Sequence, residues 1–136
     1  MKLLKIFEKP WVWAAALLSY LLLIFIVSHL SALQLRIIPF SYWDKAVHCI
    51  EYFPVGFLIS GMIHSKWTSI KAPAVIVLTI FIVGILAGLD EFHQSFVPGR
   101  DASLADVVAD LIGGTFGTVV FAAFWKTYFQ RMMTTA

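Results

Sequence analysis

The stretch PAVIVLTIFIVGILAGL, residues 73–89, contains no charged side chain and only one polar side chain, that of Thr79. A helix that crosses the hydrocarbon core of a membrane needs about 20 mostly apolar residues. Three further runs of near-spanning length occur at residues 10–33, 46–63 and 107–125. Hydrophobic residues make up 60% of the chain, and its mean hydropathy is +0.87. These features predict an integral membrane protein.

The type of membrane fold follows from the backbone. No run shows the alternation of polar and apolar residues that a membrane β-barrel needs. A helix satisfies its backbone polar groups within the segment. We therefore predict an all-α protein with four transmembrane helices, which form a single domain over residues 1–136. The predicted helices lie at about residues 11–33, 46–63, 73–90 and 104–125. The first run is longer than a signal-peptide core, so we interpret it as a membrane anchor.

The charged residues divide unevenly between the two ends of these predicted helices. Seven of the ten Lys and Arg residues lie on the side of the termini, whereas seven of the eight acidic residues lie on the other side. Because cytoplasmic loops are rich in Lys and Arg, both termini are predicted to be cytoplasmic. The basic residues are dispersed, so they predict contacts with membrane lipids and no nucleic-acid partner. The seven are Lys2, Lys5, Lys9, Lys66, Lys71, Lys126 and Arg131.

Polar residues gather where the second run begins. Asp44, His48 and Glu51 are spaced to share one face of a helix. An ionisable residue inside a membrane span needs a partner or water, and it is by default a candidate for function. The structural alternative is that Asp44 caps the helix, Lys45 extends to the interface, and the other two bond neighbouring helices. Pro54 is expected to kink this helix.

A second polar segment, LDEFHQSFVPGRDASLADVVADLIGG (residues 89–114), holds five of the eight acidic residues. Asp90 and Glu91 end the third run, and Gln94 follows one turn after Asp90. Pro98 and Gly99 then predict a turn that leads to Arg100, because proline fixes its own φ and glycine permits unusual backbone conformations.

The fourth helix begins within the same segment. Ser103 and Asp106 match a capping box. Asp110 lies one turn deeper on the same face, and capping does not explain it. Small residues allow close helix packing in a membrane, so a structural role is expected for Gly113, Gly114 and Gly117.

The sequence predicts less about the histidines that lie outside these polar helix faces. His93 is adjacent to the acidic pair, and the sequence leaves open whether it is a ligand or an interfacial side chain. His29 and His64 lie near opposite ends of their spans, and we expect them to be interfacial side chains outside the site.

Together, DKAVHCIEYFPVGFL and DEFHQSFVPGRDASLADVVADLIGGTFG resemble the VanZ-like family of small bacterial membrane proteins. The resemblance covers about residues 43–117. In the first segment it rests on Asp44, Lys45 and His48, with Tyr52 and Gly56 downstream. Asp110 departs from the family pattern, which has Asn there. In the second segment the matching residues are Asp90, Glu91, Gln94, Pro98, Gly99, Arg100, Ser103 and Asp106, followed by Gly113.

The resemblance implies a multi-pass protein of the bacterial cytoplasmic membrane and an association with resistance to the glycopeptide teicoplanin. Our first hypothesis is an extracytoplasmic polar site that acts on or binds an envelope lipid, a lipid-linked envelope precursor or a lipophilic glycopeptide. The alternative is a metal-dependent enzyme acting on a lipid-linked phosphate, with Arg100 on the phosphate. A divalent cation would then be held by oxygen and imidazole ligands from His48, Asp90, Glu91 and Asp106.

A second alternative is a structural or partner-binding protein in which acids and Arg100 form an ion-pair network. Transport is a weaker hypothesis, because four spans are few for a transporter. The sequence leaves open whether the protein is an enzyme. The residues expected to form the site, whatever its chemistry, are Asp44, Lys45, His48, Glu51, Asp90, Glu91, Gln94, Arg100, Ser103, Asp106 and Asp110.

Overall fold

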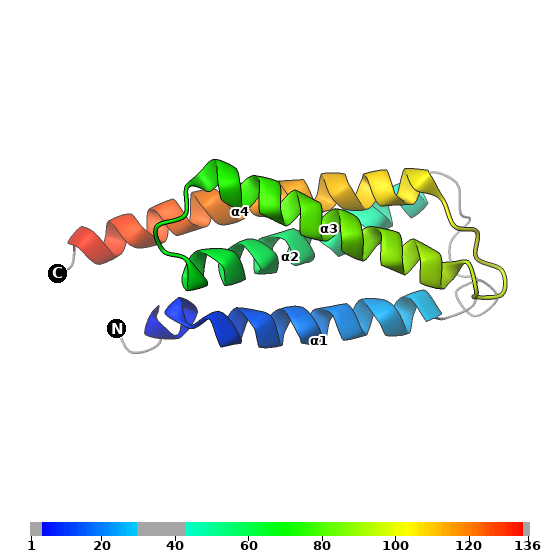
Figure 1. Ribbon diagram of the computed structural model, residues 1–136, viewed down its shortest axis with the longest axis horizontal. Coiled ribbons are helices and arrows are strands. Elements are labelled where there is room, and N and C mark those ends of the chain that lie inside the picture. Colours follow the sequence, from blue (N-terminus) through cyan, green and yellow to red (C-terminus); the bar gives the residue numbers. More distant parts are fainter. Residues whose placement is uncertain (1–3, 30–42, 135–136) are drawn as a thin grey trace.

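The computed structural model describes residues 4–29 and 43–134, all of whose regular elements are helical. A short 3-10 helix, η1 (Leu4–Glu8), precedes α1 (Pro10–His29), α2 (Trp43–Lys66), α3 (Ala72–Gln94) and α4 (Leu104–Thr134). The four α-helices run alternately in opposite directions, so that η1 and the end of α4 lie at the same end of the bundle (Figure 1). All four are long and apolar enough to cross a membrane, which confirms the predicted fold class.

Two helix boundaries differ from the prediction in a way that matters for the site. The helix α2 begins at Trp43 instead of residue 46, and α3 continues to Gln94 instead of ending at residue 90. Asp44 therefore lies in the first turn of α2, where a carboxylate is favoured by the helix dipole. The last part of the predicted first span, residues 30–33, lies outside the described residues.

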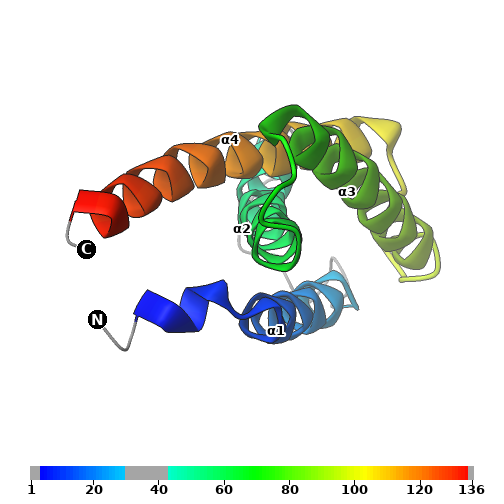
Figure 2. The same cartoon turned by 60° about the vertical axis from the view of Figure 1, so that its left-hand side comes forward.

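The helices α2 and α4 form the centre of the bundle. Figure 2 shows α2 between α1 and α4, and α3 contacts both α2 and α4. The most apolar windows of α2 and α4 are 44% and 39% buried, whereas those of α1 and α3 are each 22% buried. The polar segments at the start of α2 and the start of α4 therefore meet inside the bundle.

Glycines explain how closely α2 and α4 approach each other. A Cβ atom on Gly113 would lie 2.0 Å from the carbonyl oxygen of Cys49, and one on Gly117 would lie 2.0 Å from that of Phe53. A Cβ atom on Gly56 would lie 1.9 Å from the carbonyl oxygen of Gly114. Real Cβ atoms do not approach other atoms this closely, so these contacts confirm the close packing predicted for the fourth helix.

Apolar side chains also cover the outside of the bundle. Leu18 and Phe81 are each 67% exposed, and Leu104 is 85% exposed. Large contiguous apolar patches are rare on soluble monomers, so this surface is typical of a protein that contacts the hydrocarbon chains of lipids. Asp110 and His48, in contrast, are buried. The polar groups are thus collected inside the bundle, where they can interact with one another.

Candidate functional site

An ion pair joins the first turn of α2 to the first turn of α4. The Lys45 Nζ atom donates a hydrogen bond of 3.1 Å to Asp44 Oδ2, and it also pairs with Asp106 Oδ1 across the helix contact. Asp106 is only 4% exposed. A buried carboxylate needs a compensating charge, so Lys45 bridges the two helices and stabilises Asp106 in the interior.

The imidazole of His48 lies one turn deeper, between two sets of carboxylates. Its Nδ1 atom is 3.1 Å from Asp110 Oδ1. Its Nε2 atom is 4.0 Å from Asp44 Oδ1 and 4.0 Å from Asp106 Oδ2. His48 is 4% exposed and Asp110 is fully buried. The two ring nitrogens therefore face different acidic groups, and the ring connects them.

The cap of α4 confirms one half of the predicted capping box and corrects the other. The Ser103 Oγ atom accepts a hydrogen bond of 3.2 Å from the Ala105 N–H group, as an N-cap side chain should. The backbone N–H group of Ser103, however, donates to Glu91 Oε2 of α3, at 2.6 Å. The prediction that Asp106 closes the box was wrong, because Asp106 pairs with Lys45 instead. The cap thus ties α3 to α4.

Asp90 connects α3 to α1. Its Oδ2 atom accepts hydrogen bonds from Ser28 Oγ at 3.1 Å and from Gln94 Nε2 at 3.0 Å. Ser28 of the first helix was not among the predicted site residues. The available signal was a serine that interrupts the apolar run near its end, and it is 3% exposed in the fold.

Glu51, a predicted site residue, lies beside these ion pairs and hydrogen bonds. The carboxylate of half-buried Glu51 has no hydrogen-bond partner among the described residues, although its backbone carbonyl accepts a bond of 3.0 Å from the Tyr20 hydroxyl.

The His29 Nδ1 atom is 3.3 Å from His93 Nε2, and the two rings stack. His29 therefore contacts α3 at the end of the bundle that carries the site.

The segment between α3 and α4 turns as predicted. The Arg100 N–H group donates to the Val97 carbonyl at 3.1 Å, and Gly99 has a φ of 80°. These values match a type II turn with Pro98 in its second position and glycine in its third. Val97 is buried, which fixes the turn against the bundle and brings Arg100 to the site.

A cavity of about 260 Å³ opens at this end of the bundle, and we call it the polar pocket. Arg100 takes part in none of the ion pairs between described residues, and no acceptor among them bonds its buried Nε atom. Asp101 also lines the cavity and was not among the predicted site residues, although it directly follows Arg100. The lining residues are Asp44, His48, Gln94, Gly99, Arg100, Asp101 and Asp106.

Two groups of three side chains have the spacing to hold a metal ion. One consists of Asp44, His48 and Asp106, and the other of His48, Glu91 and Asp110. In each group, one potential ligand atom per residue lies within 4.8 Å of the others. The ligand set expected from the sequence is thus divided between them, and Asp90 belongs to neither group found among the described residues.

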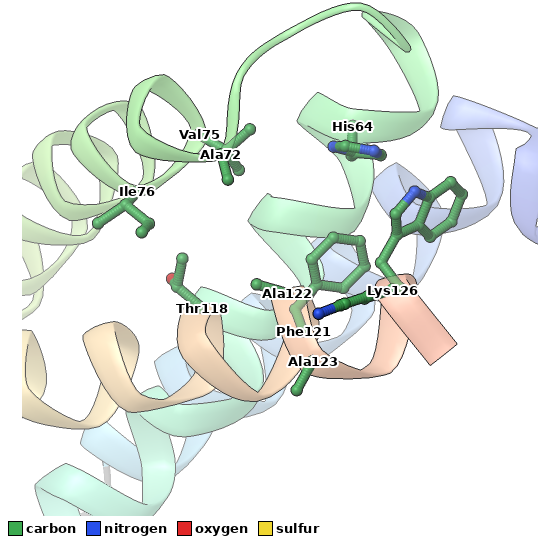
Figure 3. A pocket seen from close by; sticks show the side chains of 10 residues that line it. His64, Ala72, Val75, Ile76, Thr118, Phe121, Ala122, Ala123 and Lys126 are labelled. Carbon is green, nitrogen blue, oxygen red and sulfur yellow. The ribbon is translucent and has the colours of Figure 1, made fainter. Parts of the chain in front are cut away.

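A larger cavity, of about 470 Å³, lies at the opposite end of the bundle, and we call it the apolar pocket. Figure 3 shows side chains of α2, α3 and α4 around it, including His64, Val75 and Phe121. No carboxylate is among the described residues that line it. His64 is therefore separate from the polar pocket, as predicted.

Comparison with known proteins supports the resemblance seen in the sequence. The family model for VanZ/LLP1 matches residues 9–126. No curated protein and no solved structure matches the chain. The family match extends well beyond the predicted signature region and includes every residue of the polar pocket.

Proposed function

We propose that the chain, which belongs to the VanZ/LLP1 family, binds the phosphate-bearing headgroup of a cell-envelope lipid in the polar pocket. The observation that carries this proposal is Arg100, which lines the pocket and has no acceptor for its Nε atom among the described residues. A guanidinium group matches a phosphate through two parallel, charge-assisted hydrogen bonds. The four apolar helices make a membrane lipid the natural source of that phosphate.

The acids of the pocket are compatible with such a ligand. Lys45 pairs with both Asp44 and Asp106, so its positive charge offsets part of the negative charge of these two carboxylates. Asp101 is exposed and has no ion pair with a described residue. It is suited to bond a hydroxyl or amino group. A headgroup with a phosphate and a neighbouring hydroxyl or amine fits this combination best.

We further propose that the polar pocket faces the extracytoplasmic side of the bacterial inner membrane. The excess of basic residues near the opposite end of the bundle supports this orientation. In a Cys49→Ser background, Ser95→Cys should react with a membrane-impermeant maleimide in intact cells. Thr68→Cys, in the turn between α2 and α3, should react only after the membrane is opened. The reverse pattern would contradict the orientation.

The binding proposal is tested with purified protein in neutral detergent. Phosphatidic acid should bind, and diacylglycerol with the same acyl chains should not. Arg100→Ala should weaken phosphatidic acid binding about tenfold, because a hydrogen bond to a charged group contributes about 1.5–3 kcal/mol. Lys126→Ala removes the same charge at the apolar pocket and should leave the affinity unchanged. Equal effects of the two substitutions, or none from either, would contradict the proposal.

A second candidate is protection against teicoplanin, and the family resemblance supports it. A glycopeptide-sensitive bacterium that expresses the wild-type chain should then survive higher teicoplanin concentrations, with vancomycin tested in parallel. The protection should disappear with Arg100→Ala at matched membrane abundance. No protection by the wild-type chain would remove this candidate and leave lipid binding as the function to test.

A further inference from the structure

A buried group of three side chains lies next to the polar pocket and has an unused capacity to bind a cation. We propose that His48, Glu91 and Asp110 hold a divalent transition-metal ion, Mn²⁺ or Zn²⁺. They come from α2, α3 and α4 and are 4%, 5% and 0% exposed. One potential ligand atom of each lies within 4.8 Å of the other two.

Two oxygen atoms in this group have no hydrogen-bond partner among the described residues. Glu91 Oε1 and Asp110 Oδ2 are buried, and no donor among the described residues bonds them. Leaving a carboxylate oxygen buried and unsatisfied is costly. One cation between the two side chains would satisfy both oxygens.

The other oxygen of the Glu91 carboxylate is already held from outside the group. Glu91 Oε2 accepts the hydrogen bond from the backbone N–H group of Ser103. Metal ligands in proteins are commonly oriented by such outer contacts. The backbone bond in particular fixes Glu91 with one oxygen free to act as a ligand.

The second group of suitable spacing, Asp44 with His48 and Asp106, is a weaker candidate because it already contains a cation. The ammonium group of Lys45 bonds both of its carboxylates. Those carboxylates face His48 Nε2, whereas Nδ1 faces Asp110. Metal binding at Nδ1 would replace the proton in the 3.1 Å contact with Asp110 Oδ1, and the ring proton would then lie on Nε2, 4.0 Å from the carboxylates of Asp44 and Asp106.

The donor set indicates the class of metal. Imidazole nitrogen suits transition metals, and carboxylate oxygen suits Mn²⁺ as well as harder ions. One nitrogen and two carboxylates therefore favour Mn²⁺ or Zn²⁺ over Ca²⁺, which prefers oxygen ligands alone. Because His48 also lines the polar pocket, the ion would lie close to a phosphate bound there. The inference deepens the proposed function and rests on it for the use of the cation.

The test uses the full chain purified in neutral detergent without phospholipid, so that cation binding and headgroup binding can fail separately. Calorimetric titration with Zn²⁺ should give about one site per chain. Asp110→Asn and Glu91→Gln should each weaken Zn²⁺ binding at least about tenfold. Asn has nearly the size and shape of Asp, so the fold should tolerate the change at position 110. Asp44→Asn is the comparison, because it alters the second group and none of the three proposed ligands, and it should weaken Zn²⁺ binding less than Asp110→Asn does.

A measurement on the wild-type protein alone covers the case in which a variant does not fold. With Mn²⁺ bound, pulsed electron paramagnetic resonance should detect a coupled nitrogen from an imidazole ligand. The proposal is overturned if the wild-type chain binds neither ion, if bound Mn²⁺ shows no nitrogen coupling, or if Asp44→Asn abolishes binding while Asp110→Asn does not.

Discussion

The two ends of the helical bundle contain cavities of opposite character. The polar pocket is the smaller, at about 260 Å³, and several of its lining groups are ion-paired or hydrogen-bonded. The apolar pocket is larger, at about 470 Å³, and its lining includes Val75, Phe121 and Ala122. Specific recognition depends on a few directed polar groups more than on volume. We therefore assign ligand specificity to the smaller cavity.

The same two helices, α2 and α4, contribute to both ends, and their contact explains the difference. Near the polar pocket, Gly113 of α4 and Gly56 of α2 let the two backbones approach closely, and polar side chains of the two helices pair there. Beyond that contact, α4 extends past the end of α2 (Figure 1). The end of α2, the start of α3 and residues 118–126 of α4 enclose mainly apolar side chains around the apolar pocket.

The largest effect is expected where α2 and α4 touch. Gly113→Ala places a methyl group 2.0 Å from the Cys49 carbonyl oxygen, which must move. We expect a loss of unfolding free energy on the order of 3 kcal/mol. Thermal unfolding in detergent measures it. Gly88→Ala is the matched control, because its added methyl group meets nothing within 4 Å. Similar melting temperatures for both variants would show that the close contact does not hold the polar end together.

The next effect concerns the ion pair of the polar end. Lys45→Met leaves Asp106 buried without its cation, and removing one partner of a buried ion pair is destabilising. The Lys45 side chain is 41% exposed, so we expect a loss of about 2 kcal/mol, below the full value for a completely buried pair. Lys66→Met at the other end, where the ammonium group lies over Trp67, should cost less. An equal loss of stability for both would contradict the difference between the two ends.

A smaller effect is expected at the link between α1 and α3. Ser28→Ala removes the hydrogen bond to Asp90 Oδ2 but leaves the bond from Gln94. The expected loss of unfolding free energy is about 1 kcal/mol. Ser19→Ala, on the exposed face of the same helix, is the control for helix propensity. If Ser19→Ala lowers the melting temperature as much as Ser28→Ala, the buried hydrogen bond contributes nothing specific.

The smallest effect is expected at the apolar pocket. Ala122→Leu adds bulk to its lining, far from Arg100. Affinity for phosphatidic acid should change less than about twofold, because distant sites without shared partners behave independently. The same binding titration measures it. If Ala122→Leu lowers the affinity for phosphatidic acid as much as Arg100→Ala does, then either the headgroup binds at the apolar pocket or the two pockets are conformationally coupled. Either result would contradict the proposed site.

The sequence predicted the four helices because an uncharged run such as residues 73–89 has few alternatives to a membrane span. It did not predict where α3 ends. Asp90 and Glu91 were expected to end that span at an interface, but both lie inside the helix and are bonded to Ser28 and to the N–H group of Ser103. Those partners belong to other helices, and local spacing contains no information about them.

The same reason explains the corrected cap of α4. In a capping box, the side chain three residues after the N-cap accepts a hydrogen bond from the N-cap N–H group. This local rule predicts a bond from the Ser103 N–H group to Asp106. The fold offers Asp106 a cation, Lys45, which is distant in sequence, and it offers Ser103 the longer side chain of Glu91. The residue types of the site were therefore predictable, whereas their pairing depended on the tertiary contact between α2, α3 and α4.

The most direct measurement of the central claim is a photocrosslinking experiment that distinguishes the two cavities. A phosphatidyl alcohol with a diazirine in its headgroup is added to the purified protein, irradiated, and the labelled peptides are identified by mass spectrometry. Headgroup labelling is expected within residues 94–101, next to Arg100, and it should be lost in Arg100→Ala. Headgroup labelling confined to residues 64–76 or 118–126, which contribute the lining of the apolar pocket, would contradict the claim.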